Sequence, residues 1–502
     1  MADVSKLLVE QCIQSGDDDR LLEYWVRGGA VDWNRCYGDV CPVRISLPTY
    51  PFARDRCWIG CETWNASKHP SITPKLPENQ EIREGDLQAF YPGWDPFLAS
   101  KASAQPVTHA AVTIIGGAPE QVDAIQHENA LTTVLNIPRD ASPAVLADLF
   151  RREGWVEHLV WIAPPSSFNQ ALGQRLIEEQ EKGLCQLFNI VKALLLLAYE
   201  SRALRLTIIT TQTQVVRRGD QIQPAHAGVH GLAGTLAKEY PQWRIRVLDL
   251  QADRNWPTRD IFQLPFSKTG DTLAYRDGEW FEPVLVPVTG ICEENDLYRR
   301  GGVYVVVGGS GGLGKVWTRW MQDNYQARII WIGRRPADAD MARQLQAFAK
   351  GGLTPVYIQA DAAESSSLER ALQQIRQSHG RIHGVVHAAM DVFDLALADM
   401  TPERFRRVLA SRVNVSVQIA DAVRHEPLDF ILFFSSMASF AREGGYAGYA
   451  SGCVFMDAYA RALRTDLKCK VKVVNWGYWG VGSGERVSDQ VKMRYRRIGI
   501  EP

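Results

Sequence analysis

Short apolar runs alternate with longer helical patterns through most of this chain, from about residue 86 onward. In the first part of this region, apolar runs lie at residues 111–115, 158–162 and 206–209, and a helical pattern covers about residues 171–199. Regular alternation of strand and helix is typical of a parallel α/β sheet. We therefore expect an α/β half over residues 86–294.

The same alternation restarts at about residue 295 with a continuous apolar run at residues 303–307. The other predicted strands lie at residues 327–332, 355–358, 382–386, 430–434 and 471–474. The run at residues 303–307 has the continuously apolar pattern of a strand buried on both faces in a parallel sheet. A second α/β half over residues 295–502 is expected, so the architecture is duplicated.

The first 85 residues differ from the rest because they offer little sequence for a core. A helical pattern at residues 21–26 is followed by a stretch rich in proline and aromatic side chains. We expect residues 1–60 to lie extended on the surface of another domain, as a linker. Residues 61–85 are polar and contain proline, which predicts a flexible connector.

Composition narrows the class of protein. A chain of 502 residues with 46% hydrophobic and 23% charged residues fits a globular protein of two or three domains. A formal net charge of -1 gives no electrostatic reason to expect nucleic acid or an anionic membrane as partner. The longest apolar helical run, at residues 190–199, is too short to cross a bilayer, and the N-terminus lacks a signal-peptide core. We expect a cytoplasmic protein with a small ligand.

Metal binding is not expected. The nine cysteines indicate reduced thiols, and one group of four is spaced too widely for a usual zinc site. That group consists of Cys36, Cys41, Cys57 and Cys61. His226 and His230 lie one helical turn apart, but no Glu follows the first, so they do not form a metalloprotease motif. We expect both histidines to be packing or surface residues.

A glycine-rich turn follows directly on the apolar run at residues 303–307. Its glycines Gly309, Gly311 and Gly314 have the spacing of a dinucleotide-binding turn, in which backbone approaches the pyrophosphate. The intervening Ser310, Gly312 and Leu313 would contact the same ligand, and a helix after the turn would direct its N-terminal amides at the phosphates. The first half has only Gly116 and Gly117 at the corresponding place, so we expect no cofactor there.

The residues after the next three strands indicate which dinucleotide binds. Arg334 and Arg335 stand where an NAD-binding protein would usually place a carboxylate against the ribose, and arginines can pair with a 2′-phosphate. This favours NADPH. Asp361 could contact the adenine, and Ala388 lies in the segment expected beside the cofactor. His387, in the same segment, is assigned no catalytic role.

Ser436 ends a predicted strand, and Tyr449 lies thirteen residues later at the start of an apolar helix. Hydride delivery to a ketone builds negative charge on its oxygen, which requires a hydrogen bond and a proton donor. Ser436 and Tyr449 supply these groups. A phenol, with a pKa near ~10, needs help from a nearby cation. Short-chain dehydrogenases usually place a Lys four residues after the Tyr, where this chain has Cys453.

With these motifs the chain resembles the ketoreductase domains of modular polyketide synthases. The resemblance includes the glycine turn and Tyr449, together with residues 387–389, 401–405, 434–438 and 475–477. It implies two tandem Rossmann-like subdomains of the short-chain dehydrogenase/reductase type, the first truncated and structural, the second catalytic. Residues 47–54 resemble the linker that follows ketosynthase domains. No acyltransferase separates it from the reductase, which is typical of the trans-acyltransferase type.

Two supporting positions depart from the family pattern. The family's Lys aligns with Arg412 and its Asn with Cys453, while Met390 replaces a common Gly. Arginine keeps a permanent positive charge that can lower the pKa of Tyr449, but it cannot relay a proton by deprotonating. Cysteine offers only a weak S–H donor in place of a carboxamide.

The resemblance implies reduction of a β-ketoacyl thioester, carried on the phosphopantetheine of an acyl carrier protein, next to a ketosynthase. Of the motifs that mark the direction of substrate entrance, the chain keeps Asp394 and has Ala441 in place of Trp, which implies the B type and a D-configured alcohol. The sequence stops short of the family's last elements, so we expect a fragment of a longer synthase. A catalytically impaired scaffold domain remains an alternative. So does a sugar-nucleotide epimerase or free-standing dehydrogenase, which would need Lys at position 453.

Overall fold

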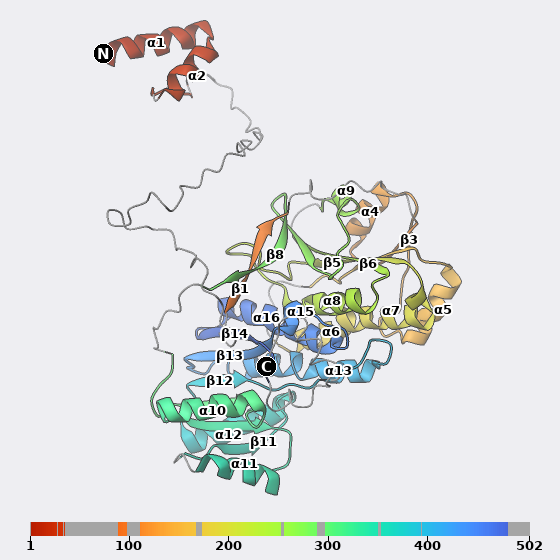
Figure 1. Ribbon diagram of the computed structural model, residues 1–502, viewed down its shortest axis with the longest axis vertical. Helices are drawn as coiled ribbons and strands as arrows, with labels where there is room; N and C mark the ends of the chain where they lie inside the picture. The colour runs from red at the N-terminus through yellow and green to blue at the C-terminus, as the bar shows by residue number, and fades with distance from the viewer. Residues whose placement is uncertain are drawn as a thin grey trace, which may run out of the picture. The chain divides into compact units, whose positions relative to one another are not determined.

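The computed structural model describes residues 2–27, 29–33, 35, 89–97, 111–166, 173–252, 256–288, 297–349, 353–392 and 394–479. The chain divides into two compact units, residues 1–79 and 80–502 (Figure 1). The cysteine group from Cys36 to Cys61 and the linker-like residues 47–54 lie outside the described residues.

The described part of the first unit includes the helices α1 (Ala2–Ser15) and α2 (Asp18–Val26). The helix predicted at residues 21–26 is confirmed by α2, which begins where the Asp17 side chain accepts a hydrogen bond from the Arg20 amide. The extended conformation expected for residues 1–60 is wrong over α1. That segment contains neither Pro nor Gly, and its Lys, Leu, Glu and Gln residues favour helix.

The described strands of the second unit form two sheets. The first has the strand order β1-β8-β7-β6-β5-β4-β2-β3. Its parallel strands are β2 (Val112–Gly116), β3 (Thr132–Val134), β4 (His158–Ile162), β5 (Leu204–Thr211), β6 (Trp243–Leu250) and β7 (Thr272–Arg276). An antiparallel ribbon of β8 (Glu279–Pro287) and β1 (Phe90–Pro96) extends it. The predicted strands of this half are confirmed, whereas the ribbon was not anticipated.

The helices of this half are α4 (Pro119–Glu128), α5 (Pro143–Glu153), α6 (Gln174–Lys182), α7 (Leu184–Leu196), α8 (Val229–Glu239) and α9 (Thr258–Ile261). Two short 3-10 helices are η3 (Tyr199–Ser201) and η4 (Pro224–His226). The single helical pattern expected over residues 171–199 is divided at Gly183, which ends α6 and precedes α7. Glycine supports helix poorly, so a break at this position is reasonable.

The second sheet is fully parallel, with the order β11-β10-β9-β12-β13-β14. Its strands are β9 (Val303–Val307), β10 (Arg328–Gly333), β11 (Val356–Gln359), β12 (Gly384–His387), β13 (Phe430–Ser436) and β14 (Lys470–Trp476). Its helices are α10 (Gly312–Tyr325), α11 (Ala339–Ala349), α12 (Ser365–His379), α13 (Pro402–Ala410), α14 (Val413–Ala422), α15 (Ala438–Ala441) and α16 (Ala447–Asp466). All six predicted strands are present, in the Rossmann order. The direction of winding reverses between β9 and β12, where ligands of such sheets bind.

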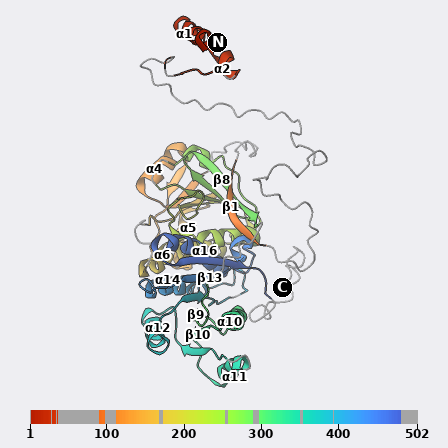
Figure 2. The same cartoon turned by 90° about the vertical axis from the view of Figure 1, so that its left-hand side faces the viewer.

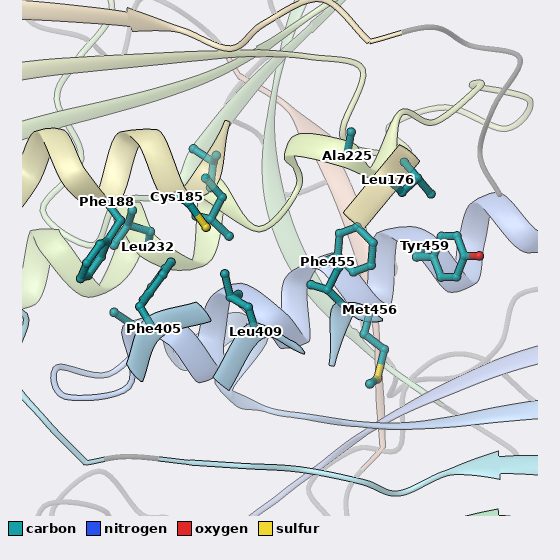
Figure 3. Close-up of a cluster of buried hydrophobic side chains, with 14 of the residues drawn as sticks. Leu176, Cys185, Phe188, Ala225, Leu232, Phe405, Leu409, Phe455, Met456 and Tyr459 are labelled. Carbon is teal, nitrogen blue, oxygen red and sulfur yellow. The ribbon is translucent and has the colours of Figure 1, made fainter. Parts of the chain in front are cut away.

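The two halves share one buried core, formed where α7 and α8 of the first meet α13 and α16 of the second (Figure 1). In the side view of Figure 2, α6 of the first half lies beside α14 of the second. Phe188 and Phe405 stack across this layer with their ring centroids 4.1 Å apart (Figure 3). On α8, a Cβ added at Gly231 would lie 2.5 Å from the backbone nitrogen of Ser451 on α16. Glycine is therefore required for these helices to approach so closely.

The sequence predicted that His226 and His230 are either packing or surface residues, and both are packing residues. Their side chains are only 5% and 3% exposed. Burial lowers the pKa of each to about 4, so both are neutral at physiological pH. His230 is hydrogen-bonded to Thr213 and Thr272. Within the described ranges, no helix is both long and apolar enough to cross a membrane.

Candidate active site

The glycine turn joins β9 to α10 at the carboxyl edge of the second sheet. Gly308 has a φ of +85°, and a Cβ there would lie 2.6 Å from the Ala389 nitrogen at the end of β12. A Cβ at Gly314 would lie 2.6 Å from the carbonyl oxygen of Gly309. A side chain at either position would therefore collide with backbone atoms and force the turn to shift. The predicted residues 309–314 all lie in this turn or in the first turn of α10.

Both predicted arginines follow β10, the strand next to β9. The Arg335 guanidinium donates a hydrogen bond to the Ser310 hydroxyl over 3.0 Å, so it lies directly at the glycine turn. Arg334, whose side chain is 57% exposed, lies 3.8 Å from the Asp391 carboxylate. Asp391 comes after β12, on the other side of β9. This ion pair was not anticipated.

The remaining predicted cofactor residues lie along the same edge. The Ala388 amide donates to the Val307 carbonyl over 2.8 Å, which places Ala388 beside the glycine turn. Asp361 follows β11, and its carboxylate accepts a hydrogen bond from the Ala363 amide over 2.9 Å. Its contact with an adenine remains a prediction.

Arg412 and Tyr449 come together, as the motifs indicated. Arg412 immediately precedes α14, and Tyr449 lies in the first turn of α16. The Arg412 guanidinium donates to the Tyr449 hydroxyl over 2.9 Å and to the Phe434 carbonyl over 2.5 Å. Only 2% of Arg412 is exposed, so its charge acts on Tyr449 with little screening by solvent.

The electrostatics of Tyr449 reflect two opposing causes. Burial raises the pKa of its phenol to about 12, while the Arg412 charge and a hydrogen bond with Ser436 oppose the shift. Tyr449 is therefore protonated at neutral pH and held beside a permanent cation. Ser436 ends β13, close to the phenol, as predicted.

Cys453 lies one helical turn beyond Tyr449 on α16 and is fully buried. Burial raises the pKa of its thiol to about 11, with Arg412 opposing the shift. A neutral, buried thiol is a poor nucleophile, so Cys453 is a small packed side chain at this position. His387 is also buried, and burial together with the Arg412 charge lowers its pKa to about 3.

Comparison with known proteins identifies this arrangement. Residues 302–481 match the model of the KR domain family. Polyketide synthase PksN of Bacillus subtilis is 41% identical over 409 residues, which cover 82% of this chain and 7% of PksN. Polyketide synthase PksM of the same organism is 40% identical over 390 residues, 78% of this chain and 9% of PksM. The chain belongs to the KR domain family of polyketide synthases. It spans less than a tenth of the length of these two relatives.

Solved structures agree with the fold of the KR domain. A ketoreductase domain from the bacillaene assembly line covers 83% of this chain and 90% of its own, with a TM-score of 0.63 and 20% identity. A multidomain structure with adenylation, ketoreductase and pseudo Asub domains, from a keto acid-selecting NRPS module, covers 81% of this chain and 36% of its own. Its TM-score is 0.71, at 19% identity.

The KR domain has a partly buried polar network that the motifs did not reveal. The Asn475 amide on β14 donates to the Asp457 carboxylate over 2.7 Å and to the Ser435 hydroxyl over 3.2 Å. Burial raises the pKa of Asp457, while its hydrogen-bonding partners oppose the shift. Asp457 follows Tyr449 and Cys453 at four-residue spacing on α16, and that spacing was the available signal.

The two predicted substrate-entrance residues lie on neighbouring loops of the KR domain. Asp394 follows β12 and is exposed, while Ala441 ends α15 after β13. The loops touch, since the Leu395 amide donates to the Gly445 carbonyl over 3.1 Å. A Cβ at Gly445 would lie 2.7 Å from a carboxylate oxygen of Asp394.

Proposed function

We propose that this KR domain reduces a β-ketoacyl thioester to the β-hydroxyacyl product with NADPH, the substrate being carried on the phosphopantetheine of an acyl carrier protein. The observation that carries the proposal is the hydrogen bond from Arg412 to Tyr449, beside Ser436. Ser436 ends β13 and the glycine turn follows β9, so both lie at the carboxyl edge of one parallel sheet. A proton donor and a dinucleotide turn therefore face one region.

The residues present fit NADPH. The glycines at 308 and 314 let the turn pack directly against the backbone of Ala389 and Gly309, and α10 begins directly after it. Arg335 at Ser310, with Arg334 beside it, presents positive charge for a 2′-phosphate, and no carboxylate stands at these two positions. Gly309 to Gly314 would hold the pyrophosphate. Bound NADPH would supply the hydride.

The protein's own groups handle the proton and the carbonyl. Tyr449, protonated at neutral pH, donates its proton to the ketone oxygen while Ser436 donates a hydrogen bond to it. The phenolate that results is stabilised by the fixed charge of Arg412. Arg412 stays charged throughout, so it holds Tyr449 without relaying a proton.

Stereochemistry follows from the two entrance positions. Asp394 is kept and Ala441 replaces the Trp of the opposite type. We infer entrance of the B type and a D-configured alcohol.

We further infer that the domain works within a trans-acyltransferase assembly line. The linker-like residues 47–54 precede the reductase with no acyltransferase between them. Relatives such as PksN are much longer polyketide synthases, which supports neighbouring ketosynthase and carrier domains as partners. Residues 86–294 would form the structural subdomain and residues 295–502 the catalytic one.

A catalytically impaired KR domain is the second candidate, and one observation favours it. Cys453 is fully buried with its pKa raised to about 11, so a weak thiol donor stands where the family has a carboxamide. In this case the domain would bind NADPH and turn over slowly.

The two candidates are separated by an assay of the purified chain with NADPH and a β-ketoacyl thioester surrogate, followed by nicotinamide absorbance. Turnover by the parent that is lost in Tyr449→Phe supports the reductase. Saturable NADPH binding without turnover supports the impaired domain, and turnover gained on changing Arg412→Lys together with Cys453→Asn would show that these two residues attenuate the chemistry. Absence of both binding and turnover would refute the reductase.

A further inference from the structure

Side chains from the first half hold both loops of the substrate entrance. The Asp394 loop (residues 394–401) is the part of the β12–α13 connection that leads into α13, and the Ala441 loop (residues 437–446) connects β13 to α16. Both belong to the second half, whereas the side chains that bind them lie on α7 and α8 of the first half.

Glu239, the last residue of α8, joins the two loops through one carboxylate. Oε1 accepts a hydrogen bond from the Gly445 amide and Oε2 accepts one from the Leu397 amide, each over 2.7 Å. Hydrogen bonds to a carboxylate are roughly twice as strong as neutral ones. Because both oxygens belong to one rigid group, the two loops are fixed relative to each other.

Two lysines bind the carbonyl groups of the same loops. The Lys192 ammonium donates to the Leu397 and Ala398 carbonyls over 2.9 and 2.5 Å. The Lys238 ammonium donates to the Ala441 carbonyl and forms an ion pair with Glu443 at 2.7 Å. Each loop is therefore held by an anion at its amides and a cation at its carbonyls.

The contact between the loops is close enough that a shift in one must move the other. Leu397 and Gly445 are both buried, and Gly445 has a φ of +89°, a conformation that favours glycine. The space beside its α-carbon is taken by the Asp394 carboxylate. Glu239 bonds the backbone at both sides of this contact.

We propose that Glu239 is a positioning residue that holds the two entrance loops in one relative arrangement, and thereby determines which face of the ketone meets the hydride. This inference rests on the proposed function, because only a reductase has a ketone face to select. Glu239 acts through the loop backbones and takes no part in proton transfer. The first half then contributes to selectivity as well as to stability.

The test compares Glu239→Gln and Glu239→Ala with the parent in the full 502-residue chain. Glutamine keeps the shape but presents one acceptor and one donor, so one amide loses its partner, while alanine releases both. Glu128→Gln, at an exposed position of α4, is the matched control. Hydrogen exchange is followed in peptides that contain Leu397 and Gly445, and the reduced product is resolved into its two epimers.

We expect exchange at these amides to be about tenfold faster in Glu239→Ala, with a smaller increase in Glu239→Gln and none in the control. The epimer ratio should fall and KM should rise, while kcat changes less because the bond between Arg412 and Tyr449 is untouched. Unchanged exchange would overturn the proposal, as would an unchanged epimer ratio and KM in an active parent. An inactive parent would refute the proposed function, and with it face selection, while exchange would still decide whether Glu239 holds the loops.

Discussion

The two halves contain the same strand, turn and helix at corresponding places. They differ in how the backbone amides at the start of the helix are satisfied. In the first half, β2 leads through Gly116 and Gly117 into α4, which begins with Pro119. Pro119 has no amide hydrogen, and the Gln121 side-chain oxygen accepts a hydrogen bond from the Ala118 amide over 2.9 Å. In the second half α10 begins after Gly311, which has no side chain with which to cap the helix.

This difference shows how one architecture can support two roles. A helix start that satisfies its own amides gains stability, whereas one that leaves them available can bind an anion. The next strand in each half also differs, in its length and in the residues that follow it. β3 has three residues, while β10 has six and is followed by Arg334 and Arg335. Only the second half combines the open turn with cations.

The largest effect should come from the proton donor proposed for the second half, Tyr449. Tyr449→Phe should lower kcat by about 10²–10⁴-fold, because the ketone oxygen then receives no proton from the enzyme. The measurement is steady-state oxidation of NADPH with a thioester surrogate. Tyr275→Phe, on β7 of the first half, is the control and should leave kcat unchanged. Equal effects of the two substitutions would contradict the assignment.

Because the two halves share a core, a substitution that disturbs the packing between them should destabilise both. Gly231→Ala should lower the free energy of unfolding by about 1–3 kcal/mol, because its Cβ would meet the backbone of Ser451. Urea unfolding monitored by hydrogen exchange should show both sheets destabilised together. Gly93→Ala on β1, where the added Cβ meets only valine methyl groups, should cost less. Loss of stability confined to one sheet would disprove a common core.

Choice of cofactor should depend on the arginine at the glycine turn. Arg335→Ala should weaken NADPH binding by roughly tenfold to a hundredfold and leave NADH binding nearly unchanged, because only NADPH carries the 2′-phosphate. Isothermal titration with each dinucleotide measures both. Arg343→Ala, on the exposed face of α11, is the matched control. A similar loss for both dinucleotides would place Arg335 elsewhere on the ligand.

Near neutral pH, the smallest effect comes from the buried histidines of the first half. The folded pKa of His226 is about 4, below its ordinary value of 6.5, so its contribution to stability is present above pH 6.5 and lost as the pH falls toward 4. One such group removes up to about 1.4 kcal/mol per pH unit in that window. His226→Gln should reduce the pH dependence of urea unfolding by this amount. The exposed His127 is the control, and an equal change in His127→Gln would contradict the prediction.

The second sheet was predictable because short, mainly apolar runs alternate with helical patterns along this half, and its turn has a known spacing. The same signals placed Arg335 at the turn. The ribbon of β1 and β8 was missed because its residues are largely exposed and its partners are far apart in sequence. Exposed strands lack the continuous apolar pattern of buried ones.

The site was predictable where motifs carry chemistry and less so where tertiary contacts do. Ser436, Tyr449 and Arg412 follow from the motifs. The hydrogen bond from Asn475 to Asp457 joins residues of separate elements, and so do the hydrogen bonds of Glu239 with the two loops. No local pattern encodes such pairs, so they became visible only in the folded chain.

The most direct test of the account is the binding of NADPH to the intact chain, followed by turnover of a β-ketoacyl thioester surrogate in the same sample. The account predicts saturable NADPH binding that exceeds NADH binding, and consumption of NADPH that depends on Tyr449. Absence of saturable NADPH binding would contradict it, because the open glycine turn and Arg335 would then hold no dinucleotide.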